Sequence, residues 1–100
     1  MAQGGFAERV AFHRDQADYF LMTARRRHLR AARLARQALQ AERNGRPLRA
    51  RRLMQAALQV KAAAGRAGLR SRNHRARVAA LRQARTTTRG TAFLPREHKF

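Results

Sequence analysis

The chain has no cysteine, tryptophan or isoleucine, and only five of its 100 residues are acidic. Without cysteine, disulfides and thiolate metal sites are excluded, although the cellular compartment stays open. No apolar run approaches the roughly 20 residues that a membrane-spanning helix requires. The first residues, MAQGGFAERVAFHRDQ, lack an apolar block and include acids, so we expect neither a secretory signal nor a transit peptide.

Bulky apolar residues are also scarce. Leu, Val and Phe together number 18, and a content below about 20% combined with high net charge is typical of disordered chains. Alanine, which occurs 22 times, favours helices but buries little surface. We therefore predict one small helical domain that folds incompletely alone and is completed by an anionic partner.

What the sequence has in excess is positive charge. It contains 24 Lys and Arg residues, a net charge of +19 and a pI near 12.0. Residues 19–96 hold 21 basic residues and a single acid, Glu42, whereas residues 1–18 are almost neutral. Codons rich in G and C would explain arginine over lysine, but they would not explain basic over acidic residues. A pI this high is typical of domains that bind nucleic acid.

Apolar residues recur three or four positions apart from Phe6 to Leu39, which predicts one long helix over residues 6–43. The sequence NGRP at residues 44–47 predicts a helix end followed by a new helix, because asparagine and glycine favour a C-terminal cap and proline favours a first turn. A second helix is expected over residues 47–64. The short connection predicts an antiparallel hairpin.

The segment GRAGLRSRN, residues 65–73, predicts a break, because two glycines three positions apart disfavour a continuous helix. Ser71 or Asn73 would cap a third helix over residues 72–85, with Val78 and Leu81 facing inward. Residues 86–100 lack periodicity and are expected to form an extended tail. The predicted fold is therefore all-α, with a single helical domain over residues 1–85.

Catalytic and metal chemistry have little support. The carboxylates are few, and no nucleophile stands in a recognisable triad. His13 and His28 share a helical face but lie about 22 Å apart, too far to hold one metal ion. The GRAG sequence is too short for a nucleotide-binding glycine loop. We expect no enzyme, no cofactor and no metal.

The stretch RRRHLRAARLARQ, residues 25–37, carries the clearest functional signal. Arg26, Arg30 and Arg33 follow one helical face, and neighbouring like charges disfavour an isolated helix. An anionic partner would relieve that repulsion. Nucleic acid is favoured over an acidic protein or a membrane surface, since a membrane helix should carry bulky apolar residues opposite its charges.

The aromatic residues lie apart from the arginines along the sequence, in the neutral N-terminal part and in the tail. This separation favours recognition of the nucleic-acid backbone over stacking on its bases. It does not distinguish RNA from DNA. Phe6, Phe12, Tyr19 and Phe20 are instead expected to contact neighbouring proteins, as is the tail through Phe93, Leu94 and Phe100.

Residues 45–81 follow a recognisable layout: NGRP at a turn, the alanine-rich segment LRARRLMQAALQVKAA, and then GLRSRNHRAR. This layout resembles the bacterial-type small-ribosomal-subunit protein number twenty family, a basic bundle of three helices whose second half reads A-G-D, an alanine-rich helix and G-L/V-x-H-K-N-x-x-A-R. The matching positions are Gly68, Leu69, Arg72, Asn73, Ala76 and Arg77. Ser71 replaces the family's usual histidine, and the acids near Phe6 depart from its lysine-rich start. The resemblance implies binding to small-subunit ribosomal RNA, with contacts from Arg72, Asn73 and Arg77.

The sequence thus predicts a structural RNA-binding component of a ribonucleoprotein. The expected ribonucleoprotein is a small ribosomal subunit, in the cytoplasm or in an organelle. A non-catalytic helical subunit that docks on an acidic protein surface and a DNA-binding accessory protein stay open as alternatives. The predicted phosphate contacts are Arg25, Arg26, Arg30, Arg33, Arg36, Arg49, Arg52, Arg72, Arg75 and Arg77, with Asn73 beside them.

Overall fold

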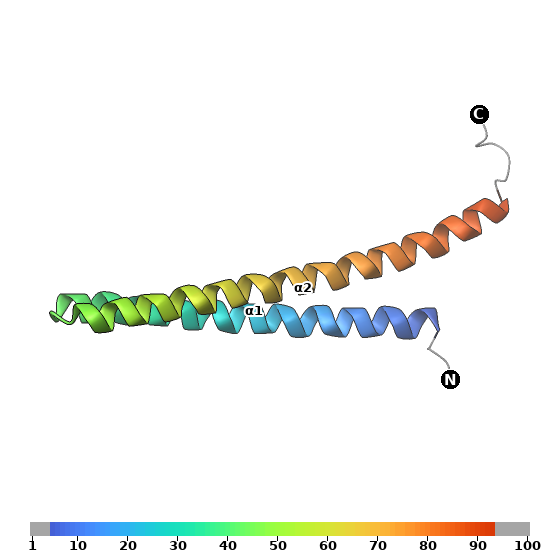
Figure 1. Ribbon diagram of the computed structural model, residues 1–100. Coiled ribbons are helices and arrows are strands. Elements are labelled where there is room, and N and C mark those ends of the chain that lie inside the picture. The colour runs from blue at the N-terminus through green and yellow to red at the C-terminus, as the bar shows by residue number, and fades with distance from the viewer. Residues whose placement is uncertain (1–4, 94–100) are drawn as a thin grey trace, which may run out of the picture.

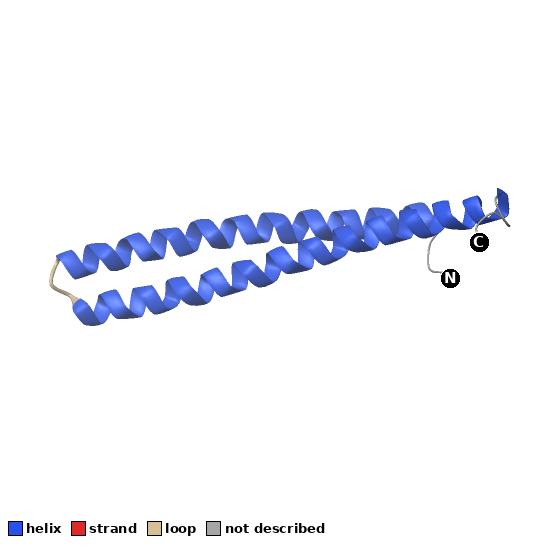
Figure 2. Cartoon of the chain, turned by 90° about the horizontal axis from the view of Figure 1, so that it is seen from above, coloured by secondary structure: helices blue, strands red, loops and turns tan. Residues whose placement is uncertain are grey.

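The computed structural model describes the backbone of residues 5–93 and the side chains of residues 5–87. These residues form two helices and no strand: α1, Phe6–Arg43, and α2, Pro47–Phe93 (Figures 1 and 2). The prediction of an all-α fold is confirmed. The prediction of three helices is wrong, because α2 covers the whole region assigned to the second and third.

Local interactions explain where α1 begins and ends. At its start the Gly5 N–H donates a hydrogen bond to the Glu8 carboxylate, which also suits the positive end of the helix dipole. At its end the N–H of Gly45 bonds to the carbonyl of Glu42, and the N–H of Arg46 bonds to that of Ala41. This pair of bonds is a Schellman motif, which needs a left-handed residue, and Gly45 has φ 73°.

The helix α2 starts at Pro47 and continues through the predicted break at residues 65–73. Gly65 and Gly68 each cost roughly 1 kcal/mol relative to alanine inside a helix. Their neighbours on the inner face offset this cost, because Ala64, Ala67 and Ser71 are buried against α1. Ser71 is therefore not a helix cap but a residue of the helix–helix interface.

The structure also differs from the prediction that an extended tail starts at residue 86. The backbone of residues 86–93 is helical, so the boundary at residue 86 is wrong, and Phe93 is the last residue of α2. Thr86 retains helical geometry and donates its hydroxyl proton to the carbonyl of Arg82 at 3.0 Å. The expected anchors Leu94 and Phe100 lie outside the described residues.

Contacts between α1 and α2 fix their relative direction. The Ser71 hydroxyl donates to the Ala17 carbonyl at 2.8 Å, and the Arg27 guanidinium donates to the Ala63 carbonyl at 3.3 Å. Because the residue number falls along α2 as it rises along α1, the helices run antiparallel, side by side in both views (Figures 1 and 2).

The interface between the helices repeats every seven residues. Buried residues of α1 recur at this interval from residue 10 to residue 38, and those of α2 from residue 57 to residue 78: Val10, Ala17, Ala24, Ala31, Ala38, and Ala57, Ala64, Ser71, Val78. We label these positions a of a heptad abcdefg, the repeat of coiled coils. The residues three places later, at d, complete the interface.

Most of the a positions hold alanine, whose small side chain lets the two helices approach closely. The Ser71–Ala17 hydrogen bond shows which a positions face each other, and the same register places Ala31 opposite Ala57 and Ala38 opposite Ala50. An alanine interface buries little apolar area, and burial contributes about 25 cal/mol per Å². The hairpin is therefore held together weakly for its length.

The helix α2 is longer than its partner. In the register set by Ser71 and Ala17, the start of α1 faces residues near Arg82, so the last ten or so residues of α2 extend about 15 Å beyond α1 (Figure 1). The hairpin therefore has a paired body and a single-helix extension.

Candidate nucleic-acid interface

All eleven residues predicted to contact nucleic acid are solvent-exposed: Arg25, Arg26, Arg30, Arg33, Arg36, Arg49, Arg52, Arg72, Asn73, Arg75 and Arg77. They lie outside the alanine interface on several faces of both helices. The charge is most one-sided in α2, whose 47 residues include 12 basic residues and no acid. No part of α2 therefore offers a carboxylate to neutralise its arginines.

The hairpin divides these residues into two groups. Arg36 and Arg52 lie at the same level of the hairpin, so the basic stretch of α1 and the start of α2 share the half next to the loop. Arg72, Asn73, Arg75 and Arg77 lie roughly 30 Å farther along α2. The fold thus distributes positive charge along its length and does not collect it in one patch.

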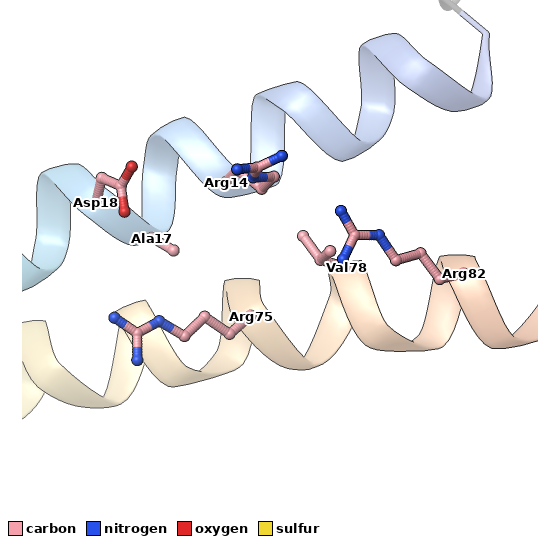
Figure 3. Close-up of a pocket in the computed structure, with 6 residues that line it drawn as sticks. All are labelled: Arg14, Ala17, Asp18, Arg75, Val78 and Arg82. Atoms are coloured by element: carbon pink, nitrogen blue, oxygen red, sulfur yellow. The ribbon is translucent and has the colours of Figure 1, made fainter.

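An arginine cleft lies in the second half, between the two helices. Arg14 of α1 and Arg75 and Arg82 of α2 surround a space of about 270 Å³ whose floor is Ala17 and Val78 (Figure 3). Asp18 contributes one carboxylate against three guanidinium groups. Because arginine can bind two phosphate oxygens at once, this arrangement suits a phosphate group.

Only Arg75 of this cleft is among the predicted contacts. Arg14 and Arg82 were missed because neither lies in a dense basic run. In the heptad register all three occupy position e, beside the a residues that form the floor. Counting the heptads of both helices outward from the loop would have placed them together.

On the opposite flank of the interface, at the same level, lies a cluster of rings. The Nδ1 atoms of His13 and His74 are 2.9 Å apart and share a hydrogen bond. The Phe20 ring stacks on His74 with a centroid distance of 5.8 Å and an interplanar angle of 5°. Phe12 packs edge-on against both histidines. This cluster joins residues about 60 positions apart in the sequence.

The cluster affects the titration of one histidine. Burial of the His13 ring, then the neighbouring His74 and Arg77, lower the pKa of His13 below its ordinary value of 6.5. A neutral His13 can accept or donate in the bond to His74, whereas two protonated rings cannot share it. The hydrogen bond between His13 and His74, which joins α1 to α2, therefore favours the neutral form of His13.

The separation of aromatic residues from arginines does not persist in the folded chain. The Arg70 guanidinium lies 5.5 Å from the centroid of the Phe20 ring, and that of Arg85 lies 4.4 Å from the centroid of Phe6. Both arginines come from α2 and both rings from α1. The expectation that the aromatic residues lie apart from the arginines was wrong, because the hairpin brings residues that are distant in the sequence close together.

The described residues contain no group of three His, Cys, Asp or Glu side chains that could hold a metal ion. His28, expected on the same stripe as His13, is exposed and lies beside Ala31, Ala32 and Lys61 in a separate groove. Neither helix has a stretch in its described part that is apolar enough to cross a membrane.

Comparisons with family models, with curated proteins and with solved structures found no match to this chain. The resemblance over residues 45–81 therefore rests on the residues quoted for it and stays a prediction. The implied three-helix bundle differs from the observed fold, since Gly68 and Leu69 lie inside α2 and not at the start of a helix.

Proposed function

We propose that this chain is a structural RNA-binding protein of a ribonucleoprotein, and that its arginines neutralise the phosphates of RNA segments packed along the hairpin. The observation that carries the proposal is α2, which holds 12 basic residues and no acid over 47 residues. The solvated surface of a helix normally carries charges of both signs. The arginines of α2 instead repel one another, and an approaching anion stabilises the helix by neutralising them.

The weak alanine interface supports the same function. Repulsion among the arginines opposes the close approach of α1 and α2, and the interface has few bulky side chains to counter it. RNA phosphates on both sides of the hairpin would remove that repulsion and stabilise the fold by binding. The choice of small-subunit ribosomal RNA comes from the resemblance over residues 45–81.

Contacts with neighbouring proteins are proposed for the N-terminal part of α1. The rings of Phe6 and Phe20 are covered by arginines, whereas Phe12 and Tyr19, at 55% and 58% exposure, offer most of their surface to a neighbouring protein. These two side chains lie in the section of the chain that has the most acids, where repulsion by other basic proteins is weakest.

The decisive experiment measures the affinity for a structured RNA and for a DNA duplex as salt is raised from about 50 to 200 mM, a range over which several phosphate contacts cost orders of magnitude in affinity. We expect a steep loss and tighter binding to RNA. Tighter binding to the duplex would favour the DNA-binding alternative. Salt-independent or undetectable binding to both polymers would overturn the proposal and leave the acidic protein surface.

Variants of the arginine cleft sharpen this test. Replacing Arg14, Arg75 and Arg82 with glutamine keeps the helix propensity and should reduce the magnitude of the salt slope by about 1, since the cleft suits one phosphate and each phosphate contact contributes roughly 0.7–0.9. The matched control replaces three exposed neutral residues, Gln37, Gln55 and Gln59, with alanine and should leave the slope unchanged.

A further inference from the structure

A second cleft lies beside the histidine pair, on the flank opposite the arginine cleft, and we name it the aromatic cleft. It encloses about 470 Å³ between α1 and α2, and its rings are His13, His74 and Phe20. We propose that this cleft binds one unstacked nucleobase of a single-stranded RNA segment together with its phosphate. The inference rests on the proposed RNA-binding function and adds base recognition to it.

The stacking surface is preformed. Because Phe20 lies parallel to His74, its ring is held in a fixed orientation by a second ring and not by flexible side chains. The Arg70 guanidinium covers Phe20 with 5.5 Å between its central carbon and the ring centroid. Two stacking layers need about 7 Å, so a base fits between them once Arg70 moves outward by about 1.5 Å. Arg70 is an exposed, long side chain, and in this movement its guanidinium exchanges the contact with Phe20 for a contact with the base.

The wall of the cleft carries groups suited to a base edge. Gln16 of α1 and Asn73 of α2 both line it, and each amide offers donors and an acceptor. Amides of this kind read the exposed edges of unpaired bases. Asn73 was among the predicted contacts, and the cleft gives it a role that a phosphate contact alone would not require.

The charged groups complete a nucleotide site. Arg77 lines the same cleft, so its guanidinium is available to the phosphate of the nucleotide while Arg70 stacks on the base. Aromatic rings within a basic groove are the usual means of binding single strands. Bases within a duplex are stacked on each other and cannot enter, so the cleft distinguishes single-stranded from double-stranded RNA.

The test compares a single-stranded RNA with the same strand annealed into a duplex, at fixed salt, for the wild-type chain and for Phe20→Leu. The variant should lose roughly 5- to 150-fold in affinity for the single strand, the contribution of stacking on one base, and nothing for the duplex. Its salt slope should not change, because no charge is removed.

The matched control is Phe6→Leu, which removes another half-buried phenylalanine that lies under an arginine, Arg85, but far from the aromatic cleft. It should change single-strand affinity by less than about twofold, within the usual effect of a neutral contact. Phe20→Tyr keeps the ring and should retain most of the affinity. Helix content measured for each variant shows whether the hairpin is intact.

If helix content falls in Phe20→Leu, a second variant, Asn73→Ala, tests the proposal, because Asn73 is exposed and its replacement should not affect the fold. The affinities of this variant for the four RNA homopolymers should differ less from one another than those of the wild type. Equal losses in Phe20→Leu and Phe6→Leu, or no loss in either, would overturn the base site while salt-sensitive RNA binding persists. The absence of salt-sensitive RNA binding would instead overturn the proposed function itself.

Discussion

The close approach of the helices can be tested by enlarging one alanine. Ala64 is fully buried, with 0% exposure, and the register places it opposite Ala24, which is 5% exposed. Replacing Ala64 with leucine adds three heavy atoms where no space exists. Overpacking of this kind costs about 1–3 kcal/mol. In a domain of this size each kcal/mol lowers the melting temperature by roughly 4–8 °C, so we expect Ala64→Leu to melt roughly 4–24 °C below wild type.

The matched control is Ala62→Leu. Ala62 lies two residues earlier on the exposed side of α2, and leucine is nearly as good a helix former as alanine. Its melting temperature should stay near that of the wild type, because surface changes usually fall within about 0.5 kcal/mol. Thermal unfolding followed by far-ultraviolet circular dichroism measures both variants. A melting temperature for Ala64→Leu equal to or above that of Ala62→Leu would refute the idea that small residues set the helix separation.

Three further outcomes follow from the geometry. Gly45→Ala should lower the free energy of unfolding by about 1–2 kcal/mol, because Gly45 has a positive φ. Gly65→Ala should raise it by about 0.5–1 kcal/mol, because a new Cβ meets nothing within 4 Å. Urea unfolding of the two variants measures whether the two changes in free energy have these opposite signs. Raising salt from about 50 to 200 mM should raise the melting temperature of the free chain by screening its repulsion, while weakening its binding to RNA; a fall in both would contradict this account. The pKa of His13 is lowered in the fold by burial, by His74 and by Arg77, so the unfolded chain binds more protons than the folded chain as the pH falls below 6.5. The free energy of unfolding should therefore decrease on acidification below pH 6.5. This pH dependence should be lost in His13→Gln.

Much of the secondary structure follows from local signals in the sequence. The bounds of α1 coincide with the predicted range, because the apolar periodicity begins at Phe6 and the Asn44–Gly45 pair forms the cap that its residue types favour. The start of α2 follows in the same way from Pro47. These signals act within a few residues, and a single sequence is sufficient to read them.

The break at Gly65 and Gly68 was wrong for a different reason. Helix propensity is a local quantity, and each glycine lowers it by about 1 kcal/mol. Whether residues 65–73 are helical depends instead on the burial of Ala64, Ala67 and Ser71 against α1. The periodicity of those three residues was visible in the sequence, but its meaning required the position of the partner helix.

The two clefts were not predicted from the sequence, because they depend on the register of the two helices. Arg75 and Asn73 were identified from composition and resemblance, but Arg14, Arg82 and Phe20 join them only when α1 and α2 are aligned across the loop. A shift of the alignment by one residue would place other side chains together. The Ser71–Ala17 hydrogen bond is the contact that identifies the alignment.

The strict seven-residue interval on both helices has a consequence for how the chain tolerates changes in length. Seven residues added to each side of the loop would lengthen the hairpin by about 10 Å and leave every existing residue facing its present neighbour. Seven residues added to one helix alone would slide the helices past each other by that same distance and separate Phe20 from Arg70. The spacing between the basic half near the loop and the two clefts is therefore adjustable in steps of one heptad, provided that the lengths from the loop to Ala17 and to Ser71 change by the same amount.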